Sequence, residues 1–153
     1  MPLNRLAIEV SLSTGLRIGD VLHLKRSQVN KQRFTIHEQK TNKARRIYIP
    51  DELQKALLQF GGEIYIFENR LDPKKPRTRQ AVYKDLKRAA KLFRIKGANV
   101  CPHSARKIFA VGQYQKSGSL KKVQQLLNHS DEAVTMLYAM ADEISARRTP
   151  KKK

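Results

Sequence analysis

Residues 13–22 read STGLRIGDVL and join two apolar patterns that are each typical of a helix. Apolar residues recur at helical spacing over residues 3–10, and Gly15 predicts the end of that helix. A short second helix is expected over residues 18–24. Arg17 stands at the start of this second helix, where the helix dipole disfavours a cation unless an anion lies nearby. The sequence around Arg17 therefore hints at a bound anion.

Beyond residue 24, apolar residues recur at every second position instead of at helical spacing. Alternating apolar and polar residues predict strands around Phe34–His37 and Arg46–Ile49, joined by a turn near Thr41–Lys43. A helix is expected over Asp51–Phe60, and the apolar segment Ile64–Phe67 is a candidate third strand.

The C-terminal half of the chain predicts helices after a basic loop. The loop is expected over Leu71–Arg79, which holds two prolines and several basic residues. Apolar patterns and capping residues predict four helices beyond it, which begin near Val82, Pro102, Ser119 and Ser130. We therefore expect an α+β fold, a mostly helical single domain over residues 1–146 with a small antiparallel three-stranded sheet. A basic, disordered tail is expected at residues 147–153.

Charge is the strongest compositional signal. The chain has 32 Lys and Arg residues against 13 Asp and Glu residues, which gives a net charge of +19 at pH 7. This excess favours a polyanionic partner, because every phosphate that a cation neutralises releases counterions. Nucleic acid is favoured over a membrane, since no segment approaches about 18 consecutive apolar residues. A single cysteine excludes an internal disulfide and fits a cytoplasmic protein.

No motif for a cofactor, metal or nucleotide is found, but a set of cations, imidazoles and a phenol stands out. His103 and Arg106 lie three residues apart, on one face of the first turn of a helix, where backbone N–H groups attract anions. His129 lies between two predicted helices, and Tyr138 follows nine residues later on an apolar stripe. Each residue alone has an ordinary structural explanation. A phenol can nevertheless attack a phosphodiester if a base, cations and an acid assist it.

Together these residues resemble the tyrosine recombinases, the phage-integrase family. Residues 13–22 resemble the first arginine motif of the family, and His103-Ser104-Ala105-Arg106 resembles its His-x-x-Arg box. Leu127–Ser130 followed by Tyr138 resembles its second histidine and its nucleophile. Gln39-Lys40-Thr41 resembles the hairpin that carries its catalytic lysine. The resemblance covers residues 13 to 138 and keeps the family's order of motifs.

The resemblance implies cleavage and rejoining of DNA strands by a type IB mechanism. Tyr138 would attack the scissile phosphate, which leaves a 3′-phosphotyrosine and a free 5′-hydroxyl. Arg17 and Arg106 would bind the non-bridging oxygens. His103 would accept or relay the tyrosine proton, and His129 would hydrogen-bond the phosphate.

Lys40 is expected to protonate the departing 5′-oxygen, with Lys43 in the same turn as the rival for this role. Asp20 is expected to brace an arginine or a histidine. The phosphotyrosine retains the energy of the phosphodiester, so the resemblance implies no metal, no ATP and no other cofactor. Asn128 stands where the family usually has Gly, and Asn is the residue that best replaces Gly in a left-handed conformation.

Double-stranded DNA is the expected partner. The other basic residues are interpreted as contacts to its backbone, namely Lys43, Arg45, Arg46, Lys74, Lys75, Arg77, Arg79 and Lys87. The resemblance implies a homo-oligomer, a tetramer, on DNA, and leaves open a monomer when the chain is free. It also suggests a bacterial, phage or mobile-element origin and association with the nucleoid. Because the arginine motif begins at residue 13, we expect the family's N-terminal DNA-binding domain to be absent.

Three other functions remain open from the sequence. A non-catalytic basic DNA-binding module would explain the charge but not the ordered set of Arg, Lys, His and Tyr residues. A type IB topoisomerase would use similar chemistry without strand exchange. A metal-dependent nuclease is disfavoured, because acidic residues are few and show no ligand spacing.

Overall fold

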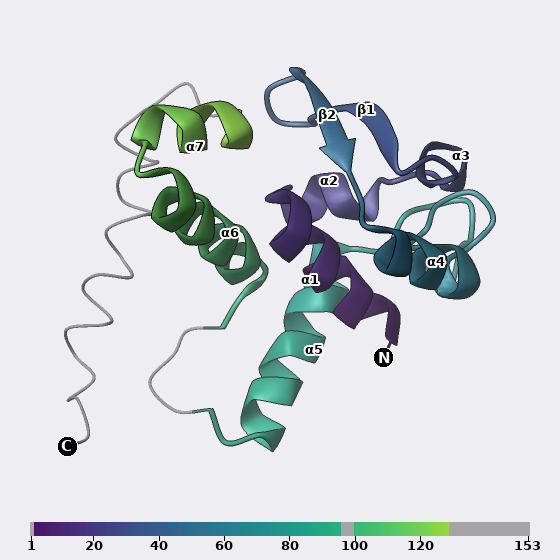
Figure 1. Cartoon of the computed structure of the whole chain (residues 1–153). Coiled ribbons are helices and arrows are strands. Elements are labelled where there is room, and N and C mark those ends of the chain that lie inside the picture. The colour runs from purple at the N-terminus through teal and green to yellow at the C-terminus, as the bar shows by residue number, and fades with distance from the viewer. Residues whose placement is uncertain (1, 96–99, 129–153) are drawn as a thin grey trace.

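The structure is a computed structural model that describes residues 2–95 and 100–128 (Figure 1). His129, the predicted last helix with Tyr138, and the tail at residues 147–153 lie outside the described residues. The described elements are α1 (Pro2–Thr14), α2 (Ile18–Leu22), α3 (Arg26–Val29), β1 (Arg33–His37), β2 (Ala44–Tyr48), α4 (Asp51–Phe60), α5 (Arg79–Leu92), α6 (Pro102–Ser117) and α7 (Leu120–Leu127). None of these helices is long and apolar enough to cross a membrane.

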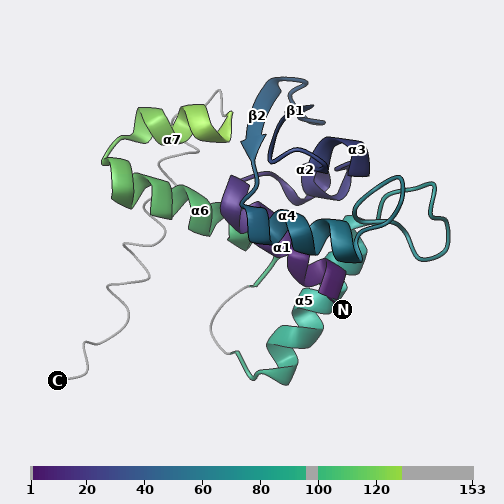
Figure 2. The same cartoon turned by 45° about the vertical axis from the view of Figure 1, so that its right-hand side comes forward.

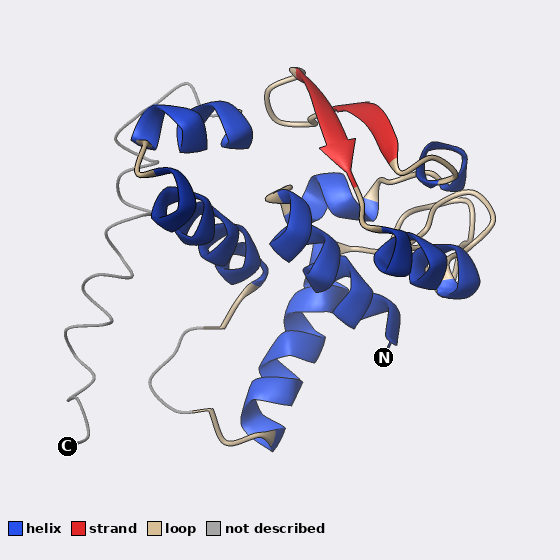
Figure 3. Cartoon of the chain, viewed as in Figure 1, coloured by secondary structure: helices blue, strands red, loops and turns tan. Residues whose placement is uncertain are grey.

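Helix α1 lies at the centre of the described fold. It packs against α2, α4 and α6, and α7 in turn packs on α6 (Figures 1 and 2). The hairpin of β1 and β2 lies on one side of α1, whereas α6 and α7 lie on the other side. Helices make up most of the ordered elements, as predicted (Figure 3). This arrangement places the end of α1 between the hairpin and α6.

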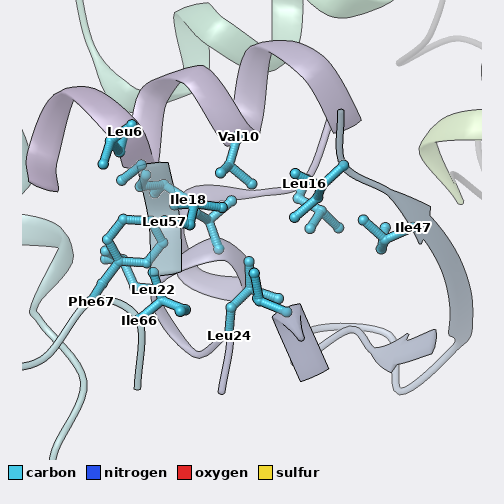
Figure 4. Packing of buried hydrophobic residues seen from close by; sticks show 14 of the residues in the cluster. Leu6, Val10, Leu16, Ile18, Leu22, Leu24, Ile47, Leu57, Ile66 and Phe67 are labelled. Atoms are coloured by element: carbon cyan, nitrogen blue, oxygen red, sulfur yellow. The ribbon is translucent and has the colours of Figure 1, made fainter. Parts of the chain in front are cut away.

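Two apolar clusters form the described core. The larger cluster combines residues of α1 and α2 with the segments around them, including Leu6, Val10, Leu16, Ile18, Leu22, Ile47, Leu57, Ile66 and Phe67 (Figure 4). The smaller cluster contains Ala110, Val123 and Leu127, from α6 and α7. Burial of these side chains is the main favourable contribution to folding.

Several predicted boundaries are confirmed. Helix α4 spans Asp51–Phe60 as expected, and α6 begins at Pro102. The Ser119 side chain caps α7 by accepting a hydrogen bond from the Lys122 backbone N–H. The second helix ends at Leu22, two residues before the predicted end.

The predicted hairpin is also confirmed. β1 pairs with β2 in antiparallel register, with Phe34 opposite Ile47 and Ile36 opposite Arg45. Residues at every second position face the core, so Ile36 and Ile47 are buried while their strand neighbours are more exposed. The period of two thus determines which side chains of the hairpin point inward.

The predicted third strand is wrong. Ile64–Phe67 contributes only an isolated bridge between Tyr65 and Lys25, and the sheet in the described residues has two strands. Lys25 lies in the short segment between α2 and α3, and α3 begins at Arg26. This segment is too short to form a longer ladder of strand hydrogen bonds with Ile64–Phe67. Ile66 and Phe67 are apolar because they enter the larger core cluster.

Gly15 is the glycine on which the end of α1 depends. Its φ is +69°, in the left-handed region, and an added Cβ would overlap the ring of Phe109 from α6. We expect Gly15→Ala to lower the free energy of unfolding by at least about 2 kcal/mol, because left-handed strain and steric overlap add. Urea denaturation of both proteins measures this difference.

Gly112→Ala is the matched control. Gly112 lies inside α6, and a Cβ there would meet no described atom within 4 Å. Its replacement should raise the free energy of unfolding by about 0.5–1 kcal/mol, through helix propensity. Equal effects of the two alanines would contradict our account of Gly15.

Candidate active site

A cavity of about 950 Å³ lies between α2, the turn of the hairpin and the start of α6. Four residues predicted to be catalytic line it: Arg17, Lys40, His103 and Arg106. These residues come from segments that are far apart in the sequence. The structure therefore brings together every predicted catalytic residue that lies in its described part.

Arg17 is the N-cap residue of α2, and its backbone is extended, with φ −65° and ψ 142°. Its Nη1 donates to Oε2 of Glu38 at 2.8 Å, and its side chain is 18% exposed. The sequence predicted an anion beside this cation, and in the folded chain a carboxylate of the protein itself is present there. Arg17 thus lines the cavity while a buried acid holds its guanidinium.

Glu38 is the site residue that sequence reasoning missed. It is 1% exposed, and its carboxylate accepts hydrogen bonds from Arg17, Thr41 and Arg45. Burial raises the pKa of Glu38, but the hydrogen bonds from Thr41, Arg45 and Arg17 and the Arg17 charge outweigh it, so the pKa lies below its ordinary value. The signal was its position, because Glu38 follows Ile36 by two residues and so continues the buried face of β1.

The turn of the hairpin carries both candidate lysines. Two backbone hydrogen bonds close it, from Asn42 N–H to the Glu38 carbonyl at 2.8 Å and from Glu38 N–H to the Lys43 carbonyl at 3.1 Å. Asn42 has a φ of 51°, in the left-handed region that Asn tolerates. Both lysines are exposed, but Lys40 lines the cavity and Lys43 does not. This placement favours Lys40 for contact with a bound phosphate.

Arg106 is buried at 2% exposure. Its Nη1 donates to the Gly15 carbonyl at 2.5 Å, and its Nη2 donates to the Leu127 carbonyl at 2.7 Å. His103, one turn earlier in α6, is exposed and lines the cavity. His103 is therefore presented to the cavity, whereas Arg106, three residues later, is fixed between the end of α1 and the end of α7.

Asp20 has a different partner from the one expected. Its Oδ1 accepts from the backbone N–H of Gln39 at 2.9 Å, so it braces the Lys40 turn rather than an arginine or a histidine in the described residues. Its Oδ2 is buried and has no hydrogen-bond partner within the described part of the chain. Burial thus directs this side chain toward a backbone donor, and its predicted role beside an arginine or a histidine of the site stays a prediction.

The predicted DNA contacts fall into two groups. The exposed ones are Lys43, Arg46, Lys74, Lys75, Arg79 and Lys87. Arg45 and Arg77 instead point inward. Arg45 donates to Glu38 and to the Thr14 carbonyl, and Arg77 donates to Oδ1 of Asn4 at 2.9 Å. Desolvation lowers the pKa of both guanidinium groups, and both are tied to other parts of the fold.

Asn128 is the last described residue. It caps the C-terminus of α7 with φ 57° and ψ 30°, which is the left-handed conformation expected where the family usually has Gly. It also lines the cavity. His129 and Tyr138, which follow it, lie outside the described residues, so their roles stay predictions.

Comparison with known proteins identifies relatives along nearly the whole chain. The profile of the phage integrase family matches residues 3–144. The chain is 30% identical over 141 residues to a probable integrase/recombinase, YoeC, of Bacillus subtilis strain 168, with 89% of this chain and 76% of YoeC covered. It is 27% identical over 157 residues to tyrosine recombinase XerD of Staphylococcus aureus strain MW2, with 95% of this chain covered. The chain spans 52% of the length of that XerD.

Solved structures show the same fold. A lambda integrase dimer bound to a COC′ core site superimposes with a TM-score of 0.73 at 23% identity, over 99% of this chain and 56% of that one. XerH recombinase in a post-cleavage complex with palindromic difH substrate gives 0.72 at 23% identity, over 94% and 44%. The catalytic domain of bacteriophage HP1 integrase gives 0.65 at 24% identity, over 95% and 82%.

The two carbonyl contacts of Arg106 generate a prediction about stability. A lysine carries the same charge but cannot donate to two separated carbonyls through a planar fork. We expect Arg106→Lys to lower the free energy of unfolding by about 2–3 kcal/mol, since a charge-assisted hydrogen bond is lost in a buried place. Urea denaturation at neutral pH provides the measurement.

Arg5→Lys serves as the control, because the Arg5 side chain is 79% exposed and pairs with Glu9 on the surface of α1. That change should alter stability by no more than about 0.5 kcal/mol. If Arg106→Lys were equally harmless, the two carbonyl contacts would not hold the helices together.

Proposed function

This chain belongs to the phage integrase family, and on that premise we propose that it is a tyrosine recombinase catalytic domain that cleaves and rejoins DNA strands. One observation carries the proposal. Arg17, Lys40, His103 and Arg106 converge on one cavity, in a chain whose net charge is +19. A phosphodiester is the substrate that such a set of cations and an imidazole would recognise.

The reaction begins with attack by the Tyr138 hydroxyl on the scissile phosphate. The new bond joins the tyrosine oxygen to phosphorus, and the bond from phosphorus to the 5′-oxygen breaks. Arg17 and Arg106 stabilise the charge that develops on the non-bridging oxygens. His103 accepts or relays the tyrosine proton, and His129 donates a hydrogen bond to the phosphate.

Lys40 protonates the 5′-oxygen as it departs. The 3′-phosphotyrosine that remains preserves the phosphodiester energy, and a 5′-hydroxyl from a partner strand can attack it and release Tyr138. This chemistry requires neither ATP nor a metal ion. Lys40 lines the cavity and Lys43 does not, which supports the assignment to Lys40.

Double-stranded DNA is the proposed substrate. XerH was solved with difH substrate and lambda integrase with a COC′ core site, and we extend this substrate class to the present chain. The exposed cations Arg46, Lys74, Lys75, Arg79 and Lys87 would contact the backbone, which makes binding sensitive to salt. We place the catalytic domain at residues 1–146 and propose that it assembles as a tetramer on DNA.

Covalent capture tests this function. Wild type and Tyr138→Phe are incubated with nicked suicide duplexes at low salt in the presence of EDTA. We expect wild type to form a protein–DNA adduct that resists SDS, whereas Tyr138→Phe binds the duplex but forms none, because it lacks the attacking oxygen.

Three results would point elsewhere. Salt-sensitive binding without an adduct would favour a non-catalytic DNA-binding module. Cleavage that disappears with EDTA would favour a metal-dependent nuclease. Relaxation of supercoiled DNA without strand exchange would favour a type IB topoisomerase.

A second experiment separates the two lysines. With a 5′-bridging phosphorothiolate, the leaving group is a thiolate, which needs no proton. We expect Lys40→Ala to cleave the normal substrate about 100-fold more slowly than wild type and to recover most of the rate on the phosphorothiolate. Lys43→Ala should be slow on neither substrate, and rescue of Lys43→Ala in its place would transfer the acid role to Lys43.

A further inference from the structure

One buried carboxylate connects two parts of the cavity wall. Oε2 of Glu38 accepts from Arg17 Nη1 at 2.8 Å and from Thr41 Oγ1 at 3.0 Å. Arg17 precedes α2, whereas Thr41 is the neighbour of Lys40 in the hairpin turn. The same oxygen therefore contacts both segments that deliver a proposed phosphate-binding cation.

The main chain of Glu38 reinforces this connection. Its N–H and its carbonyl close the turn through Lys43 and Asn42. Its other carboxylate oxygen, Oε1, accepts from Arg45 Nη1 at 3.2 Å. The second nitrogen of Arg45, Nη2, donates to the Thr14 carbonyl at the end of α1. Glu38 is thus held from three directions and has little freedom to move.

Glu38 does not need Arg17 to compensate its buried charge. Arg45 compensates the buried charge of Glu38 from inside the protein, since the Arg45 side chain is only 9% exposed. Arg17 is more exposed, at 18%, and lines the cavity. Without the carboxylate, two arginines would face each other and the Arg17 guanidinium would be free to turn toward solvent.

We propose that Glu38 is a positioning residue, which fixes the Arg17 guanidinium and the Lys40 turn relative to each other before the phosphate binds. The proposal rests on the proposed function, because it assigns Arg17 and Lys40 to the phosphate. Glu38 itself does not touch the reacting atoms. It supplies preorganisation, so that the two cations need not rearrange when the transition state forms.

Glu38→Gln tests the proposal, since it keeps the size of the side chain and removes its charge. In single-turnover cleavage of a suicide duplex, we expect the rate to fall roughly 10- to 100-fold, while the Kd for the duplex changes by less than about twofold. A residue with a purely structural role would not separate the cleavage rate from the affinity in this way.

Gln54→Met is the matched control. Gln54 is buried in α4 and donates to the Val29 carbonyl at 2.6 Å, away from the cavity. This change removes a buried hydrogen bond at similar volume, so it destabilises the fold without touching the site. Below its melting transition, Gln54→Met should cleave at the wild-type rate. An equal rate loss in both variants would reduce the Glu38 effect to general destabilisation and overturn the proposal.

A double-mutant cycle adds a direct test of the link to Arg17. If Glu38 acts by holding Arg17, then Glu38→Gln combined with Arg17→Ala should be no more than about threefold slower than Arg17→Ala alone. Full multiplication of the two single effects would show that Glu38 acts independently of Arg17, and a wild-type rate in Glu38→Gln would remove the role altogether.

An NMR measurement decides the positioning without any cleavage. The order parameter of the Arg17 side-chain Nε–Hε should fall in Glu38→Gln, whereas that of Arg26 should not change. Arg26 is the internal reference because it donates to the carbonyls of Leu58, Gly61 and Gly62 instead. The two proposals can fail separately. If wild type forms no adduct with DNA, the proposed function fails. If the Arg17 order parameter is unchanged in Glu38→Gln, the positioning by Glu38 is refuted.

Discussion

The guanidinium of Arg106 connects three helices through two backbone carbonyls. It extends from α6 and donates to Gly15, just after α1, and to Leu127, the last residue of α7. The carbonyls at the end of a helix have no partner within the helix, so a buried cation satisfies acceptors that would otherwise be left unpaired. This contact, together with the direct packing of α6 on α1, sets the position of α6 and α7 relative to the larger core, and with it the cavity.

Backbone carbonyls at the end of α1 accept hydrogen bonds from both sides of the cavity. The carbonyl of Thr14 accepts from Arg45 of the hairpin, and the next carbonyl, that of Gly15, accepts from Arg106 of α6. Gly15 permits this close approach because its left-handed φ turns the chain and leaves room for Phe109. Two arginines from opposite sides of the molecule thus share one short segment of backbone, and Glu38 extends the connection to Arg17.

Within the described residues, local patterns in the sequence predicted the hairpin and the helices other than α3, and the ordered motifs predicted that Arg17, Lys40, His103 and Arg106 would meet at one site. The third strand failed, since apolar character at Ile64–Phe67 reports burial but not the length of the partner strand. Basic character likewise did not distinguish Arg45 and Arg77 from exposed cations, because their partners are distant in sequence. The alternation that buries Ile36 and Ile47 also turns Glu38 and Arg45 inward. The period of two therefore predicts their inward position, although their charge suggests exposure.

Two of the groups that hold Arg106 are neutral, which has an electrostatic consequence. A carbonyl carries no net charge, so the contacts to Gly15 and Leu127 fix the guanidinium without placing an opposite charge beside it. An aspartate or glutamate in their place would fix the side chain equally well and would neutralise it. These two contacts therefore do not reduce the positive potential that an approaching polyanion meets at the cavity, within a Debye length of about 10 Å at 0.1 M salt.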